Sequence, residues 1–206
     1  MDRKKEFREM LDMQQATNNQ VDSDWVKKKR EWYRAVWIEC GELMEHYGGW
    51  KWWKKTDNER TQVLLELIDI WHFGLSILIC KHGKEAAAAV LSEQWHELKE
   101  ESFHISVEKI ALSALKDKTF SIYDFCSAFN NAGYTFDNLY ANYIGKNVLN
   151  KFRQDNGYKN GNYKKIWLGK EDNVILAEIL DKLDVKHNDY QMKIYRLLDD
   201  AYRGAP

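Results

Sequence analysis

Two pairs of acidic residues, each with its members three positions apart, carry the strongest chemical signal in the sequence. Glu39 and Glu42 lie in IECGELMEHY, and Glu66 and Asp69 lie in LLELIDIWHFG. Residues three apart on a helix share a face, so each pair would project its two carboxylates together. Four converging carboxylates repel one another unless cations neutralise them. Oxygen ligands without thiolates favour Mg²⁺, with Mn²⁺ as a substitute, so the pattern predicts a catalytic site for divalent cations.

Either pair alone is an ordinary feature, because E-x-x-E occurs often on solvated helix faces. Two observations favour a site here. The segment VLLELIDIWHF is apolar on nearly every side, so its two acids lie on a helix that we expect to be buried, and buried acids need partners. Only a short connection separates the two acidic segments, so their helices should be antiparallel neighbours.

A second chemical signal is the segment 146–170, which carries seven basic residues and one acid in a chain whose formal net charge is −1. Lys146, Asn150 and Arg153 follow an i, i+4, i+7 spacing, so they line one stripe of a helix. Their ammonium, amide and guanidinium groups together suit the binding of a polyphosphate. The glycines that follow allow a mobile loop to close on a bound ligand. The loop residues that we expect to contact phosphate are Tyr158, Lys159 and Lys165. The alternative is a solvated basic face or a weak nucleic-acid patch.

The elements that must position these residues are helices. A period of about 3.6 residues runs through most of the chain, the only proline is the last residue, and no segment alternates like a strand. Thr56 with Glu59, and Ser121 with Asp124, have the spacing of capping boxes. The expected helices are a first one around Phe7–Met13, then about 25–47, 57–82, 84–101, 104–116, 121–131, 136–154, 171–184 and 188–203.

These elements predict an all-α fold in one domain, 1–206. We expect a helical bundle-type core, with the four-carboxylate site between two antiparallel helices, and a smaller helical lobe at about 84–134 that is able to move. At 206 residues the chain is long enough to bury a sizeable core.

The composition of the chain indicates the cellular compartment and the kinds of partner to expect. The near-neutral charge provides no global attraction to nucleic acid or to a membrane surface. The longest apolar run, LSILIC, is far too short to span a bilayer, and the charged N-terminus does not read as a signal peptide. The three cysteines are widely spaced and odd in number, which fits a reducing compartment. We therefore expect a cytoplasmic protein with no membrane partner and no specific nucleic-acid partner.

The order of these motifs resembles a known family. The E-x-x-E pair, then KWWK, then ELIDIWHF is similar to the dimeric all-α dUTPases, within the wider group of all-α nucleoside triphosphate pyrophosphohydrolases. The resemblance continues in MQQATNN near the start and in GKNVLNKFRQDNGYKNGNYKKIWLGKEDN near the end. The four acids are shared across the whole group, whereas the late block is more specific to dUTPases.

This resemblance implies hydrolysis of dUTP, and of dUDP, to dUMP by attack of water on the α-phosphate, with two or more Mg²⁺ ions and a homodimer as the active form. Glu42 is our choice for the residue that orients and deprotonates the water. Thr17 stands where family members often have a leucine, and the doubled Gln14/Gln15 and Asn18/Asn19 leave the register of the base contacts open. The nucleoside contacts that we expect are Gln14, Asn18, Trp53, Phe73, Asn150 and Asn173.

Two alternatives stay open. A broader pyrophosphohydrolase that acts on dCTP or on a modified nucleotide would carry the same four acids. A non-catalytic helical interaction protein would carry its acids and lysines merely as surface charges, and it predicts that Glu66 and Asp69 are exposed.

Overall fold

A computed structural model describes residues 3–99, 101–185 and 189–204, and within these ranges the chain forms nine α-helices and one two-stranded sheet. The prediction of an all-α fold is confirmed. The chain divides into two compact units, one that extends through Leu139 and one that begins at Tyr140. Each unit is described by itself, and the expectation of a single domain stays a prediction.

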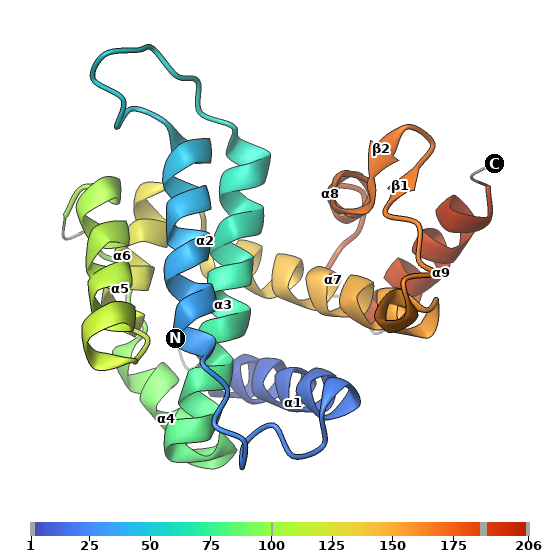
Figure 1. Ribbon diagram of the computed structural model, residues 1–206, viewed down its shortest axis with the longest axis horizontal. Helices are drawn as coiled ribbons and strands as arrows, with labels where there is room; N and C mark the ends of the chain where they lie inside the picture. The colour runs from blue at the N-terminus through green and yellow to red at the C-terminus, as the bar shows by residue number, and fades with distance from the viewer. Residues whose placement is uncertain (1–2, 100, 186–188, 205–206) are drawn as a thin grey trace. The chain divides into compact units, whose positions relative to one another are not determined.

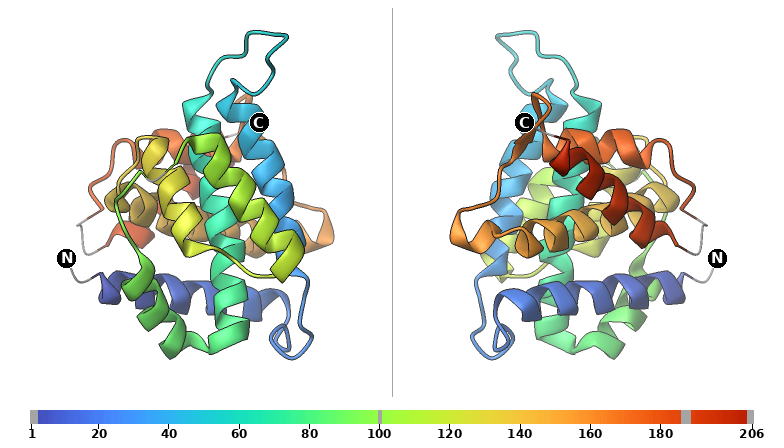
Figure 2. Two further views of the ribbon diagram at one scale, coloured as in Figure 1. Left: turned by 90° about the vertical axis from the view of Figure 1, so that its left-hand side faces the viewer. Right: turned by 90° about the vertical axis from the view of Figure 1, so that its right-hand side faces the viewer.

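The first unit is built around one apolar helix. Helix α3 contributes Leu67, Ile70, Trp71 and Leu75 to the core, all fully buried. Helix α2 packs along α3 and also contacts α5, which in turn contacts α6; α1 and α4 contact each other and α3 (Figures 1 and 2). The bounds are α1 Lys4–Val21, α2 Trp32–Tyr47, α3 Arg60–His82, α4 Lys84–Gln94, α5 Phe103–Asp117 and α6 Ile122–Asn131.

Helix α3 shows that the longest apolar segment extends beyond the run LSILIC that the sequence suggested. LSILIC is only part of this 23-residue helix, which is long and apolar enough to cross a membrane by length and composition alone. However, 78% of its apolar window is buried inside the protein. Because the neighbouring helices already cover these side chains, α3 reads as a core helix.

Two helix starts differ from the prediction. Helix α2 begins at Trp32 rather than near 25, because the preceding segment is held in turns by Asp22, which accepts from Lys28 Nζ at 2.7 Å and Arg30 Nη2 at 2.8 Å. Helix α3 begins at Arg60, and the expected capping box does not form. The Thr56 hydroxyl instead accepts from the Gly49 amide at 2.9 Å, which ties the two sides of the α2–α3 connection together.

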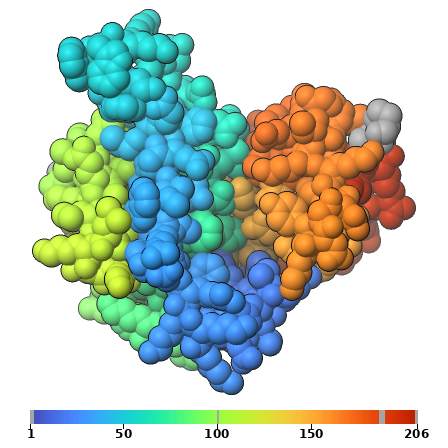
Figure 3. Space-filling view, in the orientation of Figure 1, coloured from blue at the N-terminus to red at the C-terminus, as the bar shows by residue number. Residues whose placement is uncertain are grey.

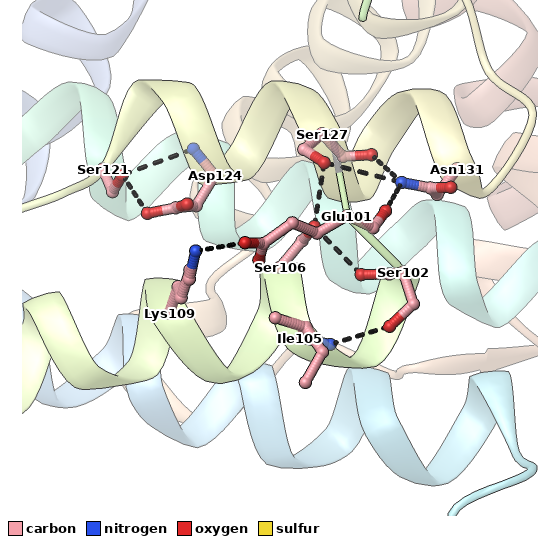
Figure 4. Close-up of polar contacts among 9 residues, drawn as sticks. All are labelled: Glu101, Ser102, Ile105, Ser106, Lys109, Ser121, Asp124, Ser127 and Asn131. Carbon is pink, nitrogen blue, oxygen red and sulfur yellow. Dashed lines mark hydrogen bonds and ion pairs between the residues drawn. The ribbon is translucent and has the colours of Figure 1, made fainter. Parts of the chain in front are cut away.

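The segment expected to be a smaller lobe forms α4 to α6. The helix expected at 84–101 ends at Gln94, whereas the Ser121 cap of α6 forms as predicted, with its hydroxyl accepting from the Asp124 amide. Between α5 and α6 the Ser106 hydroxyl donates to Ser127 Oγ at 2.9 Å (Figure 4). This buried polar bridge fixes the register of the two helices. Motion of the lobe stays a prediction.

The second unit collects around aromatic rings. Phe152 near the end of α7 and Trp167 of the sheet are fully buried, and both contact Tyr202 of α9 edge-on. The bounds are α7 Phe136–Asp155, which crosses the division between the units, η1 Tyr158–Asn160, β1 Ile166–Trp167, β2 Lys170–Glu171, α8 Asp172–Leu180 and α9 Tyr190–Arg203. The antiparallel pair β1–β2 was not predicted, because two-residue strands are too short to show alternation. The expected start of the last helix at 188 lies outside the described residues.

Candidate functional site

The first unit brings the acidic pairs together between α2 and α3. Glu39 and Glu42 of α2 and Glu66 of α3 each offer a carboxylate oxygen, and these atoms lie within 4.8 Å of one another. Asp69 lies one turn further along α3, and its charge acts on Glu39. Glu66 is only 9% exposed. The alternative of a non-catalytic interaction protein predicts an exposed Glu66, so this burial counts against it.

The pKa of Glu39 shows how strongly its surroundings disfavour another negative charge in this cluster. Burial raises the pKa of Glu39 to about 8, assisted by a hydrogen bond shared with Glu66 and by the charges of Asp69, Glu66 and Glu42. Burial, together with the surplus of negative charge from the neighbouring acids, keeps a proton on this carboxyl group near neutral pH. Oxygen ligands this close suit a hard divalent cation, which would remove the surplus, so the residues present fit Mg²⁺. Cys40, between the acids in sequence, has a pKa raised to about 12, mainly by burial, and is chemically inert.

His46 was not singled out from the sequence. It is one turn beyond Glu42 on α2, its Nε2 lies 3.8 Å from Glu66 Oε1, and its Nδ1 lies 2.7 Å from Glu59 Oε2. Its carbonyl also accepts from the Glu59 amide at 2.9 Å. The residue therefore joins the end of α2 to the start of α3 beside the acidic cluster. Its i+4 spacing from Glu42 was the available signal.

Two expected base contacts, Gln14 and Asn18, take part in a buried ring of hydrogen bonds between α1 and α3. Gln14 Oε1 lies 2.7 Å from His72 Nδ1, which must carry the proton because an amide oxygen only accepts. Gln14 Nε2 donates to Asn18 Oδ1 at 3.0 Å, and Asn18 Nδ2 donates to Ser76 Oγ at 2.9 Å. The Ser76 hydroxyl returns to the His72 carbonyl at 3.0 Å. The side chains are thus oriented by their neighbours, and their contact with a base stays a prediction.

The aromatic residues expected at the nucleoside lie apart in the first unit. Phe73 is half-buried on α3 and stacks with Trp32 at a centroid distance of 6.2 Å. Trp53 lies in the projecting α2–α3 connection (Figure 3) and is 58% exposed, with Trp52 and Trp50 edge-on against it. Both rings remain predicted walls of the pocket.

The second unit gathers the basic stripe around a buried acid. Arg153 donates through Nε and Nη2 to the two carboxylate oxygens of Asp172, each at 2.8 Å, and Tyr163 donates its hydroxyl to the same carboxylate at 2.8 Å. Burial alone would raise the pKa of Asp172, but the guanidinium and the hydroxyl outweigh it and hold this pKa below its usual range. Lys146 and Arg153 both donate to Asn173 Oδ1, each at 3.3 Å.

Asp172 and Tyr163 are members of this cluster that sequence reasoning missed. The remaining expected phosphate contacts lie on the following loop. The Tyr158 ring lies 5.9 Å from Arg153 Cζ, and Lys159 and Lys165 are exposed.

An all-α fold with a cluster of carboxylates in one unit and a lysine–arginine–amide cluster in the other defines the class of protein: a helical protein that gathers acidic side chains in one unit and basic side chains in the other. The sequence matches the dUTPase family over residues 6–158, which is most of the chain. The chain belongs to this all-α dUTPase family, and it is a hydrolase of the dUTP diphosphatase type whose substrate is a nucleotide. The match includes the four acids, whereas Lys159, Lys165 and Asn173 lie beyond it. A comparison with curated proteins gave no match.

Proposed function

We propose that the protein hydrolyses dUTP, and also dUDP, to dUMP in a Mg²⁺-dependent reaction, with Mn²⁺ able to substitute. Pyrophosphate would leave from dUTP and phosphate from dUDP. The observation that carries the proposal is the convergence of Glu39, Glu42 and Glu66 across the α2–α3 interface, together with the raised pKa of Glu39. Such a cluster is stable in its charged form only with a cation bound.

In this proposal Glu39, Glu42, Glu66 and Asp69 hold two or more Mg²⁺ ions. When bound, the ions would offset the negative charge of the substrate phosphates and would lower the pKa of the attacking water. Glu42 is the exposed member of the cluster, so it is the carboxylate that solvent reaches most easily. We assign it the orientation and deprotonation of the water that attacks the α-phosphorus.

The proposed counter-charge for the leaving group comes from the basic residues of helix α7 and of the loop that follows it. Lys146, Arg153, Lys159 and Lys165, with the hydroxyl of Tyr158, would stabilise the negative charge that develops on pyrophosphate. Support comes from the enrichment of cations on the α7 stripe and the following loop, set against a nearly neutral chain.

Recognition of the nucleoside is assigned to Gln14 and Asn18 for the base, with Trp53 and Phe73 as walls and Asn150 and Asn173 near the nucleotide. Amide groups match the donor and acceptor edge of uracil. We also propose a homodimer as the active form and the cytoplasm as its location, where the three free cysteines would remain reduced.

The decisive experiment incubates the purified protein with each deoxynucleoside triphosphate and with dUDP, in Mg²⁺, and measures release of pyrophosphate or phosphate. Rapid hydrolysis of dUTP and dUDP, with slow hydrolysis of the other deoxynucleoside triphosphates, supports the assignment. Equal rates with dCTP or dTTP would favour the broader pyrophosphohydrolase, and full activity in excess chelator would overturn the metal role. Light scattering that shows an active monomer would overturn the homodimer.

A further inference from the structure

Among the described residues of the second unit, Asp172 is the charged residue with the smallest exposed fraction. It is the first residue of α8, its exposed fraction is 0%, and its carboxylate accepts both donors of one edge of the Arg153 guanidinium. A buried carboxylate with this bidentate geometry fixes the plane of the guanidinium as well as its charge. The two residues are 19 positions apart, so the contact also closes the loop between α7 and α8.

The rest of the Arg153 guanidinium is committed to two amides. An arginine carries five N–H donors. Besides its bonds to Asp172, Arg153 donates from Nη1 to Asn150 Oδ1 at 3.2 Å and from Nη2 to Asn173 Oδ1 at 3.3 Å. Among the described residues, one Nη1 hydrogen is left for a ligand.

These contacts determine which way the two carboxamides point. Arginine and lysine only donate, so the oxygens of Asn150 and Asn173 must face Arg153, and Lys146 donates to the same Asn173 oxygen. Their amino groups are therefore turned away from the guanidinium. A surface rich in N–H donors suits the acceptor oxygens of a phosphate, whereas the N3–H of uracil needs an acceptor.

We propose that Asp172 is a positioning residue of the reaction: it fixes the Arg153 guanidinium and, through it, the carboxamides of Asn150 and Asn173, so that the cluster presents donors to the substrate phosphates. This inference rests on the proposed function of the second unit in phosphate binding. It also moves the two asparagines from the nucleoside to the phosphate chain.

The test is Asp172→Asn, whose amide retains the shape but can accept only one of the two Arg153 bonds. Binding of the non-hydrolysable α,β-imido analogue of dUTP and of deoxyuridine is measured by titration calorimetry well below the melting temperature. We expect roughly tenfold to hundredfold weaker binding of the analogue, in line with loss of hydrogen bonds to charged groups. Deoxyuridine, which has no phosphate, should bind within about twofold of the wild type, because only the phosphate contacts change.

Tyr163→Phe is the matched control, because it removes a hydrogen bond to the same carboxylate and leaves the Arg153 pair in place. It should lower the melting temperature without changing the ratio of the two affinities. If Asp172→Asn also leaves this ratio at the wild-type value, Asp172 is only a structural residue and the proposal is overturned.

A measurement on the wild type keeps the proposal testable if Asp172→Asn does not fold. Arginine side-chain NMR should show a slowly exchanging Arg153 Nε–H, and added pyrophosphate should shift the Nη1 signals more than Nε. A rapidly exchanging Nε–H overturns the proposal. Failure of the proposed function gives a different result, because the wild type itself would then neither hydrolyse dUTP nor bind the analogue more tightly than deoxyuridine.

Discussion

Glu39 and Glu66 share a hydrogen bond across the interface of α2 and α3, although both are carboxyl groups. One of them must carry the proton, since two carboxylates cannot donate to each other. Burial raises the pKa of Glu39 to about 8, and the hydrogen bond with Glu66 and the charges of the neighbouring acids add to this shift. Metal binding should therefore be coupled to release of a proton.

Mg²⁺ binding at pH 7 should release about one proton, because a coordinating carboxyl must be ionised. Calorimetric titrations in buffers of different ionisation enthalpy measure the release, which should vanish well above pH 8. Equal binding heats in all buffers at pH 7 would contradict the assignment. Glu39→Gln should abolish the release.

Without metal, the Glu39 carboxyl should make the free energy of unfolding decrease as pH rises. A carboxyl with a folded pKa of about 8 binds a proton that the unfolded chain loses near pH 4.5. The stability that this carboxyl contributes is complete below pH 4.5 and is lost progressively as the pH rises to about 8. Thermal unfolding in chelator should show a decreasing melting temperature over this window, and Glu39→Gln should flatten the trend.

Glu42→Gln should lower kcat by about 100- to 10,000-fold, the range for loss of a general base. Glu42 is exposed, so the melting temperature should change little. Glu45→Gln, one turn further along α2 and outside the acidic cluster, is the control and should retain activity. A fully active Glu42→Gln enzyme would show that another group activates the water.

Asn18→Ala should cost both stability and discrimination. Asn18 is 6% exposed and connects Gln14 to Ser76, so its loss leaves buried polar groups without partners, at about 1–3 kcal/mol. If this residue also orients the base contacts, the preference for dUTP over dCTP should decrease. Competition assays and urea unfolding measure the two effects, and exposed Gln20→Ala should show neither.

Trp53→Ala should raise the KM for dUTP and leave the melting temperature unchanged, because this ring is predicted to wall the nucleoside and lies at the surface. Trp52→Ala provides the comparison, since that ring is 89% exposed and has no assigned role. Steady-state kinetics on both variants distinguish the residues. Identical KM values in the two variants would remove Trp53 from the pocket.

Two glycines in helices should respond in opposite directions to alanine. A Cβ at Gly74 of α3 would come within 2.7 Å of the buried Phe120 ring, which predicts a loss of about 1–3 kcal/mol from overpacking. A Cβ at Gly41 of α2 meets nothing within 4 Å, so Gly41→Ala should stabilise by about 0.5–1 kcal/mol. Chemical unfolding measures both changes.

The sequence by itself determined the class of fold and most of its helices. Helical periodicity and capping are local, so the cap at Ser121 and the helices at 104–116 and 136–154 could be placed to within a residue or two. Local signals failed where a contact outside the helix wins, as at Thr56, which bonds back to Gly49, seven positions earlier, instead of capping α3. The pairing of the acids was also local in origin, since each pair lies within one helix.

Only the tertiary structure decided how the site residues are partnered. Gln14 and His72 are 58 positions apart, and Asp172 reaches Arg153 across 19. No periodicity records such contacts, because they depend on which buried donor meets which acceptor once the helices pack. The low polarity of the interior makes those pairings obligatory, and it sets the proton on Glu39 and the charge on Asp172.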